Sequence, residues 1–348
     1  MRILVISTDR KLFEENSGVR QRIVEYGSLV EEMHIVVFSK RQSQISNLKS
    51  QKFGNVFLYP TNSRSRWFYI CDAIKIGKKI LSNKGQWLIT TQDPFECGWV
   101  GYWLAKKFKI SLQLQIHTDF LSPYFVKESV LNKIRIYIAK FLIPRANCIR
   151  VVSERIKNSL KKDSVVLPIF VDVQKIREAP IKTDLHSRYS QFNFIILMAG
   201  RLTKEKNINF AIEAIKEIGD KNIGLIIVGG RLIEEKMPAN IIFESWTDDL
   251  ASYYKTADLF LLTSNYEGYG MTLVEAAAAG CKIISTDVGI AREILEEENI
   301  CRVGDKNDLK EKIKKAIMGE IKSCRNLRFK AKEKYLEEYK KNWESCGF

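Results

Sequence analysis

Two glutamates eight positions apart, Glu267 and Glu275, frame the stretch of the sequence best suited to bind a phosphorylated ligand. Between them lie Gly268-Tyr269-Gly270 and an apolar run, which predict a glycine turn followed by a helix. The preceding residues, 259–264, are typical of a buried parallel strand. A helix N-terminus offers backbone N–H groups to phosphate, whereas carboxylates bind hydroxyls rather than anions. Phosphate and hydroxyls together indicate a sugar nucleotide.

A second segment with suitable chemistry, 198–207, follows another predicted strand and contains Arg201 and Lys206. A guanidinium orients a diphosphate through paired hydrogen bonds, and an ammonium neutralises it. The alternative is a solvated basic loop, because Lys204 and Lys206 flank Glu205. The glutamate motif further along the chain favours the diphosphate site.

Short runs rich in valine and isoleucine recur along the chain and alternate with helical patterns. They lie at 3–6, 35–38, 56–59, 87–90, 112–116 and 148–152, and again at 194–198, 225–228, 241–243, 259–262 and 282–285. Most lack a polar alternation, as expected for parallel strands covered on both faces. This order predicts an α/β protein with two Rossmann-like, doubly wound parallel-sheet domains that face a deep cleft.

The strand pattern breaks between Pro168 and Phe192, which sets the expected domain boundary. We predict an N-terminal domain of residues 1–180, a C-terminal domain of residues 181–323, and a C-terminal helix of residues 324–348 that packs back on the N-terminal domain. Within the second domain, 207–219 has helical periodicity, with Asn207 as its predicted N-cap and Gly219 as its C-terminal stop.

The composition favours an anionic partner and a reducing compartment. The 348 residues include 56 Lys and Arg against 41 Asp and Glu, a net charge of +15, and 45% hydrophobic residues supply two cores. The seven cysteines are scattered and form no C-x-x-C pair, so neither a metal site nor a disulfide framework is expected. No apolar run approaches the roughly 20 residues that span a bilayer.

Part of the positive charge lies in the segment 127–155, where Lys and Arg alternate with large apolar residues. One interpretation is a helix that faces an anionic membrane, in which case the acceptor would be lipid-linked. The other is a core-packed helix with a solvated basic face. The expected location is cytoplasmic, at the inner face of the membrane under the first interpretation.

The two motifs together resemble those of a known family. Gly-Arg-Leu-x-x-x-Lys-Asn at 200–207, followed by Glu-Gly-Tyr-Gly-Met-x-x-x-Glu at 267–275, resembles the donor half of retaining glycosyltransferases of family 4, the glycosyl transferases group 1, which have the GT-B fold. The resemblance implies a nucleotide-diphosphate sugar as donor, and neither a metal nor another cofactor. It covers nearly the whole chain, more strongly after Phe194.

The resemblance also implies roles for the motif residues. Arg201 and Lys206 would hold the diphosphate and stabilise the charge that grows on it, Glu267 would bind sugar hydroxyls, and Glu275 would bind the ribose. Backbone groups of the glycine turn and the following helix would contact sugar and phosphate oxygens. These donor-binding residues are Gly268, Tyr269, Gly270, Met271, Thr272 and Leu273.

Two residues of the first half complete the implied site. His117 ends the predicted strand at 112–116, where the family's histidine reaches the donor sugar; the alternative is a structural histidine. The loop after the first strand has Ser17-Gly18 where the family often has two glycines, so only Gly18 corresponds to a donor-binding residue.

The predicted function is therefore retaining transfer of a sugar to a hydroxyl of a glycan or lipid-linked acceptor, with catalytic roles for His117, Arg201, Lys206 and Glu267. The alternatives are an epimerase or phosphorylase on the same fold, or a non-enzymatic basic protein that binds nucleic acid or membrane. No nucleic-acid-binding motif occurs in the sequence, so no nucleic-acid partner is expected.

Overall fold

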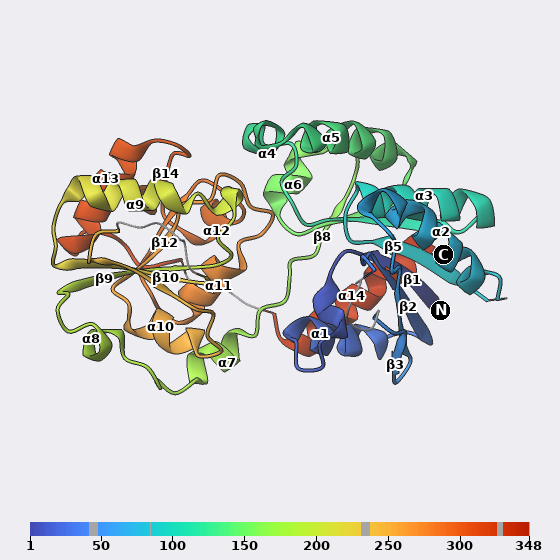
Figure 1. The fold of residues 1–348 in the computed structure, drawn as a ribbon, viewed down its shortest axis with the longest axis horizontal. Coiled ribbons are helices and arrows are strands. Elements are labelled where there is room, and N and C mark those ends of the chain that lie inside the picture. Colours follow the sequence, from blue (N-terminus) through green and yellow to red (C-terminus); the bar gives the residue numbers. More distant parts are fainter. Residues whose placement is uncertain (42–47, 84, 231–236, 326–329, 348) are drawn as a thin grey trace. The chain divides into compact units, whose positions relative to one another are not determined.

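The structure is a computed structural model that describes residues 1–348 except 42–47, 84, 231–236, 326–329 and 348. It divides into two compact units, each with its own sheet (Figure 1). The first unit comprises residues 1–121, 129–168 and 331–348, and the second comprises residues 122–128 and 169–330.

The first unit is built on an eight-stranded sheet with the order β3-β4-β2-β1-β5-β6-β7-β8. Its strands are β1 (Arg2–Ser7), β2 (Glu32–Val37), β3 (Gln51–Phe53), β4 (Val56–Pro60), β5 (Trp87–Thr91), β6 (Ser111–Ile116), β7 (Cys148–Val151) and β8 (Val165–Val166). All neighbours pair in parallel except β3, which forms an antiparallel hairpin with β4. The predicted runs form strands, whereas the two edge strands β3 and β8, of three and two residues, carried no recognisable pattern.

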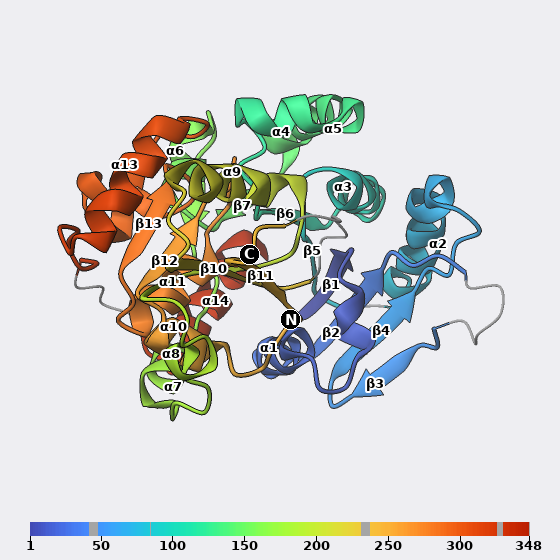
Figure 2. The same cartoon turned by 60° about the vertical axis from the view of Figure 1, so that its left-hand side comes forward.

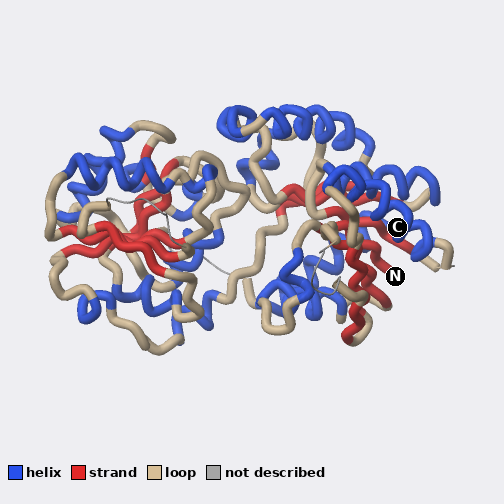
Figure 3. Tube along the Cα trace, in the orientation of Figure 1, coloured by secondary structure: helices blue, strands red, loops and turns tan. Residues whose placement is uncertain are grey.

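Helices cover both faces of this sheet, as the tube in Figure 3 shows. On one face α3 packs against β1, β5 and β6, and its neighbours α2 and α5 pack against it. On the other face α14 packs against β5 and β6, and Tyr26 of α1 stacks on Tyr339 of α14. The helices are α1 (Gly18–Gly27), α2 (Tyr69–Leu81), α3 (Glu96–Phe108), α5 (Val130–Leu142), α6 (Glu154–Ser159) and α14 (Lys332–Gly347), with the 3-10 turns η1 (Arg10–Phe13), η2 (Arg66–Phe68) and η3 (Ile143–Arg145).

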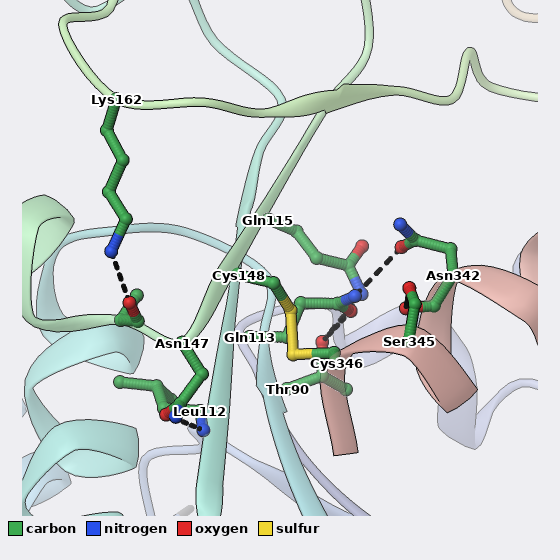
Figure 4. Close-up of a disulfide and its surroundings, with 11 residues drawn as sticks. Thr90, Leu112, Gln113, Gln115, Asn147, Cys148, Lys162, Asn342, Ser345 and Cys346 are labelled. Carbon is green, nitrogen blue, oxygen red and sulfur yellow. Dashed lines mark hydrogen bonds between the residues drawn. A yellow bond between two sulfur atoms is a disulfide. The ribbon is translucent and has the colours of Figure 1, made fainter. Parts of the chain in front are cut away.

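The C-terminal helix α14 is held to the first unit by a buried cation and a disulfide. The Arg150 guanidinium donates to Tyr339 Oη (3.1 Å) and Gln115 Oε1 (2.7 Å), and its carbon lies 4.6 Å from the Tyr339 ring centroid. Cys148 of β7 is bonded to Cys346, with 5.6 Å between their Cα atoms (Figure 4). Beside the disulfide, Gln113 Nε2 donates to Asn342 Oδ1 at 2.8 Å.

The expectation that the chain has no disulfide is therefore wrong. The two cysteines are 198 positions apart in sequence, and only the packing of α14 on the sheet brings them within bonding distance. The disulfide also removes the main reason for expecting a reducing compartment.

The second unit is built on a six-stranded parallel sheet with the order β11-β10-β9-β12-β13-β14. Its strands are β9 (Phe194–Ala199), β10 (Ile223–Val228), β11 (Ile241–Glu244), β12 (Leu259–Leu262), β13 (Ile283–Thr286) and β14 (Ile300–Cys301). Successive residues of β9 enter different cores: Ile195 and Leu197 pack on one side, and Ile196 and Met198 on the other. The sheet is buried on both faces, as the continuous apolar runs predict.

Helices of the second unit also form two layers. Residues of α9 and α13 line one core, and residues of α7, α10, α11 and α12 line the other. The helices are α4 (Pro123–Glu128), α7 (Val173–Glu178), α8 (Leu185–Arg188), α9 (Ile208–Ile218), α10 (Leu250–Thr256), α11 (Met271–Ala278), α12 (Ala291–Ile294) and α13 (Lys306–Ile317), with the 3-10 turns η4 (Lys204–Lys206) and η5 (Glu297–Asn299).

The unit boundaries differ from the predicted ones in three places. The division falls after Pro168 rather than after residue 180, because α7 packs on α11, and Lys255 Nζ donates to Arg177 O at 2.9 Å. Residues 122–128 join the second unit, in which Tyr124 Oη donates to Val303 O at 3.1 Å. The last helix begins at Lys332, and residues 326–329 of its predicted span lie outside the described residues.

None of the helices in the described parts of the chain is both long enough and apolar enough to cross a bilayer.

Reduction of the Cys148–Cys346 disulfide is expected to lower the free energy of unfolding by about 2–5 kcal/mol, because the cross-link restricts a long loop of the unfolded chain. Denaturation of the protein with and without dithiothreitol, and of Cys346→Ser, measures this change. Cys71→Ser is the matched control, because Cys71 is exposed and unpaired. Equal stability of Cys346→Ser and the oxidised parent protein would contradict the prediction.

Candidate active site

The predicted motifs of the second unit lie on two loops at one edge of its sheet. The loop of residues 200–207 follows β9, and the loop of residues 263–270 follows β12. These strands are parallel neighbours, with Leu259 paired to Ile196 and Phe260 to Leu197. Their carboxyl ends therefore meet at the edge where open α/β sheets bind ligands.

An ion pair between Lys206 and Glu267 joins the two loops. The Lys206 ammonium contacts Glu267 Oε1, and the two side chains are only 16% and 13% exposed. Ser264 Oγ donates to the same carboxylate oxygen at 2.7 Å. The structure therefore brings together the residue predicted to bind the diphosphate and the residue predicted to bind the sugar, and each compensates the half-buried charge of the other.

Polar contacts of the neighbouring residues reinforce this junction. Asn265 N donates to Glu205 O at 2.7 Å, and Thr263 Oγ1 donates to Lys206 O at 3.1 Å. Asn207 Nδ2 donates to Asn265 Oδ1 at 3.0 Å. Asn207 is the N-cap residue of α9, as predicted, but its backbone is left-handed (φ 47°) rather than extended and its side chain makes no capping bond. Gly219 ends α9 in the left-handed conformation, as predicted.

Arg201 differs from Lys206 in its exposure. Its side chain is 79% exposed, and Nη2 lies 3.2 Å from Glu205 Oε1. Exposed pairs of this kind contribute little to stability. The guanidinium is therefore able to leave Glu205 for an anionic ligand at low cost.

The glycine turn leads into α11 at the same edge of the sheet. Gly270 is the N-cap residue, with a φ of 92° that favours glycine, and α11 begins at Met271. The amides of Met271 and Thr272 belong to the first helical turn, where the helix itself supplies no acceptor. The Leu273 amide differs, because it donates to Gly270 O at 3.0 Å inside the turn.

Gly289, which the sequence patterns did not single out, supports this turn from behind. A Cβ atom there would lie 2.3 Å from Tyr269 O and 3.1 Å from Glu267 Cβ. The next residue, Ile290, donates its N–H to Tyr269 O at 3.0 Å. No larger residue fits between this segment and the turn without displacing one of them.

Glu275 lies one turn into α11 and is half-buried. Tyr254 Oη of α10 donates to Glu275 Oε2 at 3.0 Å. Burial raises the pKa of the Glu275 carboxyl, and the Tyr254 hydrogen bond offsets part of this effect. Tyr254 is therefore the partner that a carboxylate in an apolar helix needs. The sequence patterns did not identify it, and the one local signal was the tyrosine pair Tyr253-Tyr254 in an amphipathic segment.

His117, in the first unit, follows β6 and is oriented by a polar network. Its Nε2 lies 3.0 Å from Gln115 Oε1, which also accepts from Arg150 Nη1 at 2.7 Å. Gln115 Nε2 donates to Thr90 Oγ1 at 2.8 Å, which fixes the orientation of the amide. Because Gln115 Oε1 is an acceptor, the proton of the neutral His117 ring lies on Nε2 and leaves Nδ1 as its acceptor.

The charge state of His117 follows from its surroundings. Burial, with smaller contributions from the Arg150 and Arg22 cations, lowers the pKa of the imidazole to about 3. His117 is therefore neutral at physiological pH and acts there as a hydrogen-bonding group rather than a cation.

Gly18 is the first residue of α1, and Ser17 Oγ accepts from Arg20 N at 3.1 Å as its N-cap. A Cβ atom at Gly18 would meet nothing within 4 Å. The serine that departs from the family pattern thus caps α1. The residues predicted for the site fall into two groups: Gly18 and His117 in the first unit, and the others in the second.

The contribution of His117 to the free energy of unfolding is expected to fall by about 3 kcal/mol between pH 7 and pH 4. The ordinary pKa of the imidazole is 6.5, whereas in the folded chain it is about 3, so the unfolded chain binds the proton first as the pH falls. The stabilising contribution of His117 is therefore fully present above pH 6.5 and is lost progressively as the pH falls toward 3. Denaturation of the parent protein and His117→Asn at several pH values measures the difference; parallel profiles would contradict it.

The sequence of this chain is similar to those of known glycosyltransferases. The model of the family Glycosyl transferases group 1 matches residues 188–334, which contain both motifs of the second unit. An uncharacterized glycosyltransferase from Methanocaldococcus jannaschii is 30% identical over 292 residues, covering 80% of this chain and 78% of the relative. Alpha-monoglucosyldiacylglycerol synthase from Streptococcus pneumoniae is 24% identical over 225 residues, covering 57% of this chain and 51% of that enzyme.

A solved structure with a similar fold covers almost the whole chain. HepE from Anabaena, in complex with UDP and glucose, matches with a TM-score of 0.66 at 16% identity, over 99% of this chain and 94% of HepE. With two parallel-sheet α/β units and these relatives, the chain belongs to the glycosyl transferases group 1 and has the GT-B fold.

Proposed function

We propose that this protein is a retaining, family 4 glycosyltransferase that moves a sugar from a nucleotide-diphosphate sugar to a hydroxyl of a glycan or lipid-linked acceptor. The observation that carries the proposal is the junction of Lys206 and Glu267 beside the N-terminus of α11. It combines a cation, a carboxylate and helix amides at one sheet edge, which suits a phosphorylated sugar. The UDP and glucose in the HepE complex support a nucleotide sugar as donor.

Each group has a separate role in the proposed donor complex. Lys206 and the exposed Arg201 bind the diphosphate, together with the first-turn amides of α11. Glu267 accepts hydrogen bonds from the sugar hydroxyls, and Glu275 accepts them from the ribose. Lys206 remains beside Glu267, so its charge offsets the repulsion between that carboxylate and the phosphates.

In the proposed reaction, the acceptor hydroxyl attacks the anomeric carbon from the face that the diphosphate leaves. The bond from that carbon to the phosphate oxygen breaks, the bond to the acceptor oxygen forms, and the hydroxyl proton passes to the departing phosphate. Arg201 and Lys206 stabilise the charge that grows on the diphosphate, which is the role a divalent metal has in other transferases. We therefore propose a metal-independent reaction without a cofactor.

Neutral His117 contributes hydrogen bonding to the sugar rather than charge, because its pKa lies well below physiological pH. The name of the pneumococcal relative, a synthase of a glucosyl lipid, supports testing a lipid-linked hydroxyl first. Epimerisation and non-enzymatic binding are not favoured; identification of the product sugar and its linkage distinguishes them from transfer.

Replacement of Arg201, Lys206 or Glu267 by alanine is expected to reduce turnover at least ~100-fold, because each loses a group that acts on developing charge or on the sugar. The measurement is release of nucleoside diphosphate from UDP-, GDP- and ADP-sugars. Arg201→Ala is the sharpest of the three, since this exposed side chain supports no core.

Arg292→Ala is the matched control, because Arg292 is also an exposed arginine of the second unit and is paired with Asp287. It is expected to retain the activity of the parent protein. Near-normal turnover in all three site variants would refute the assignment of the site.

Gly289→Ala is expected to weaken nucleotide binding about 10-fold or more, because its methyl group would displace the turn that carries Glu267 and Gly270. The shift of the melting temperature on addition of UDP measures binding directly. Gly319→Ala serves as the control: Gly319 also has a positive φ, 79°, but a Cβ atom there meets nothing within 4 Å. Equal shifts in both variants would show that Gly289 does not support the site.

A further inference from the structure

Helix α5 of the first unit carries an unusual concentration of exposed apolar side chains. Thirteen large apolar residues are exposed in the described parts of the chain, and five of them lie on this helix. Their exposed fractions range from 38% for Phe141 to 75% for Tyr137. The five, here called the α5 face, are Val130, Leu131, Ile134, Tyr137 and Phe141.

The α5 face is a continuous stripe rather than a scatter of single residues. At 3.6 residues per turn, its five side chains fall within an arc of about 120°. The opposite side of α5 is buried in the unit, through Asn132, Ile136, Ala139 and Leu142. Figures 1 and 2 show α5 in the outer helix layer of its unit, beside α3. The helix thus already has a complete core contact, and the exposed stripe is a second apolar surface.

The charged residues of the α5 segment itself are all of one sign. Lys133 and Lys140 are exposed along one edge of the stripe, and Arg145 follows the helix, with its guanidinium carbon 3.7 Å from the Phe141 ring centroid. The sequence contains no Asp or Glu from Ser129 to Ser153. The surface therefore combines apolar side chains with an uncompensated cationic edge.

The helix is rigidly attached to the unit. Arg135 Nη2 lies 2.9 Å from Glu96 Oε1 of α3, and the Phe141 and Trp99 ring centroids are 5.8 Å apart. Trp99 is itself exposed and extends the apolar stripe onto α3. Docking through this surface requires no unfolding, because the face is already formed in the folded unit.

We propose that the α5 face docks the first unit onto an anionic phospholipid surface. The apolar side chains enter the boundary between headgroups and acyl chains, the lysine ammoniums meet anionic headgroups, and Tyr137 and Trp99 lie at the interface. The cationic edge carries no carboxylates and therefore complements anionic headgroups, and the apolar stripe beside it suits insertion among them. This inference goes beyond the proposed sugar transfer and does not depend on it.

The test is co-sedimentation of the full chain with vesicles of phosphatidylglycerol and phosphatidylcholine at low salt, without donor or acceptor. The parent protein is expected to bind these vesicles and not to bind vesicles of phosphatidylcholine alone. Salt at roughly 0.5 M is expected to release it, because the Debye length then falls below about 5 Å. Ile134→Glu with Tyr137→Glu is expected to reduce binding at least ~10-fold, as is Lys133→Glu with Lys140→Glu.

Ile181→Glu with Met318→Glu is the matched control, because both residues are exposed apolar side chains of the second unit. It is expected to bind as the parent protein does, and melting temperatures verify that every variant is folded. Absence of parent binding, or equal binding by the α5 variants and the control, would overturn the proposal. So would a dimer in sedimentation velocity that the Ile134 and Tyr137 substitutions dissociate, because the face would then bind a second copy.

Discussion

The ion pair between Lys206 and Glu267 is the interaction on which the candidate site depends. A carboxylate beside a phosphate site is unfavourable unless a cation accompanies it, and two buried charges are tolerated only when they meet. The pair requires that the loops after β9 and β12 emerge side by side, which the parallel register of these strands provides. Thr263 and Asn265 then hold the two loops together, and Ser264 orients Glu267 within its own loop.

Neighbouring residues of the second unit hold the segments around this ion pair in place. Gly289 leaves room for the turn that carries Glu267, and Gly270 gives the chain the left-handed conformation with which α11 begins. Tyr254 satisfies Glu275 one turn further along the helix. Because these contacts come from several strand ends, the site is held by the rigid sheet rather than by any single loop.

In the first unit, the buried charge of Arg150 is the feature on which the neighbouring elements depend. This buried guanidinium is satisfied by carbonyl, amide and phenol oxygens, and it connects the C-terminal helix to the residue that orients His117. Its positive charge also disfavours protonation of His117. The packing of α14 and the charge state of a predicted site residue therefore depend on the same side chain, with the disulfide to Cys346 reinforcing the helix.

Local patterns in the sequence determined the longer strands, the two sheets and the fold class, because strands buried on both faces leave signals within a few residues. They also determined the two motifs that contain Arg201, Lys206, Glu267 and Glu275, because a helix N-terminus leaves a signal of the same kind. Contacts between distant segments left no such signal. Tertiary structure alone decided the pairing of Cys148 with Cys346 and the hydrogen bond of Asn207 between the loops. It also decided that Gly289 supports the glycine turn and that residues 122–128 belong to the second unit. Each depends on which surfaces the packed sheets bring together, and neither composition nor spacing encodes that proximity.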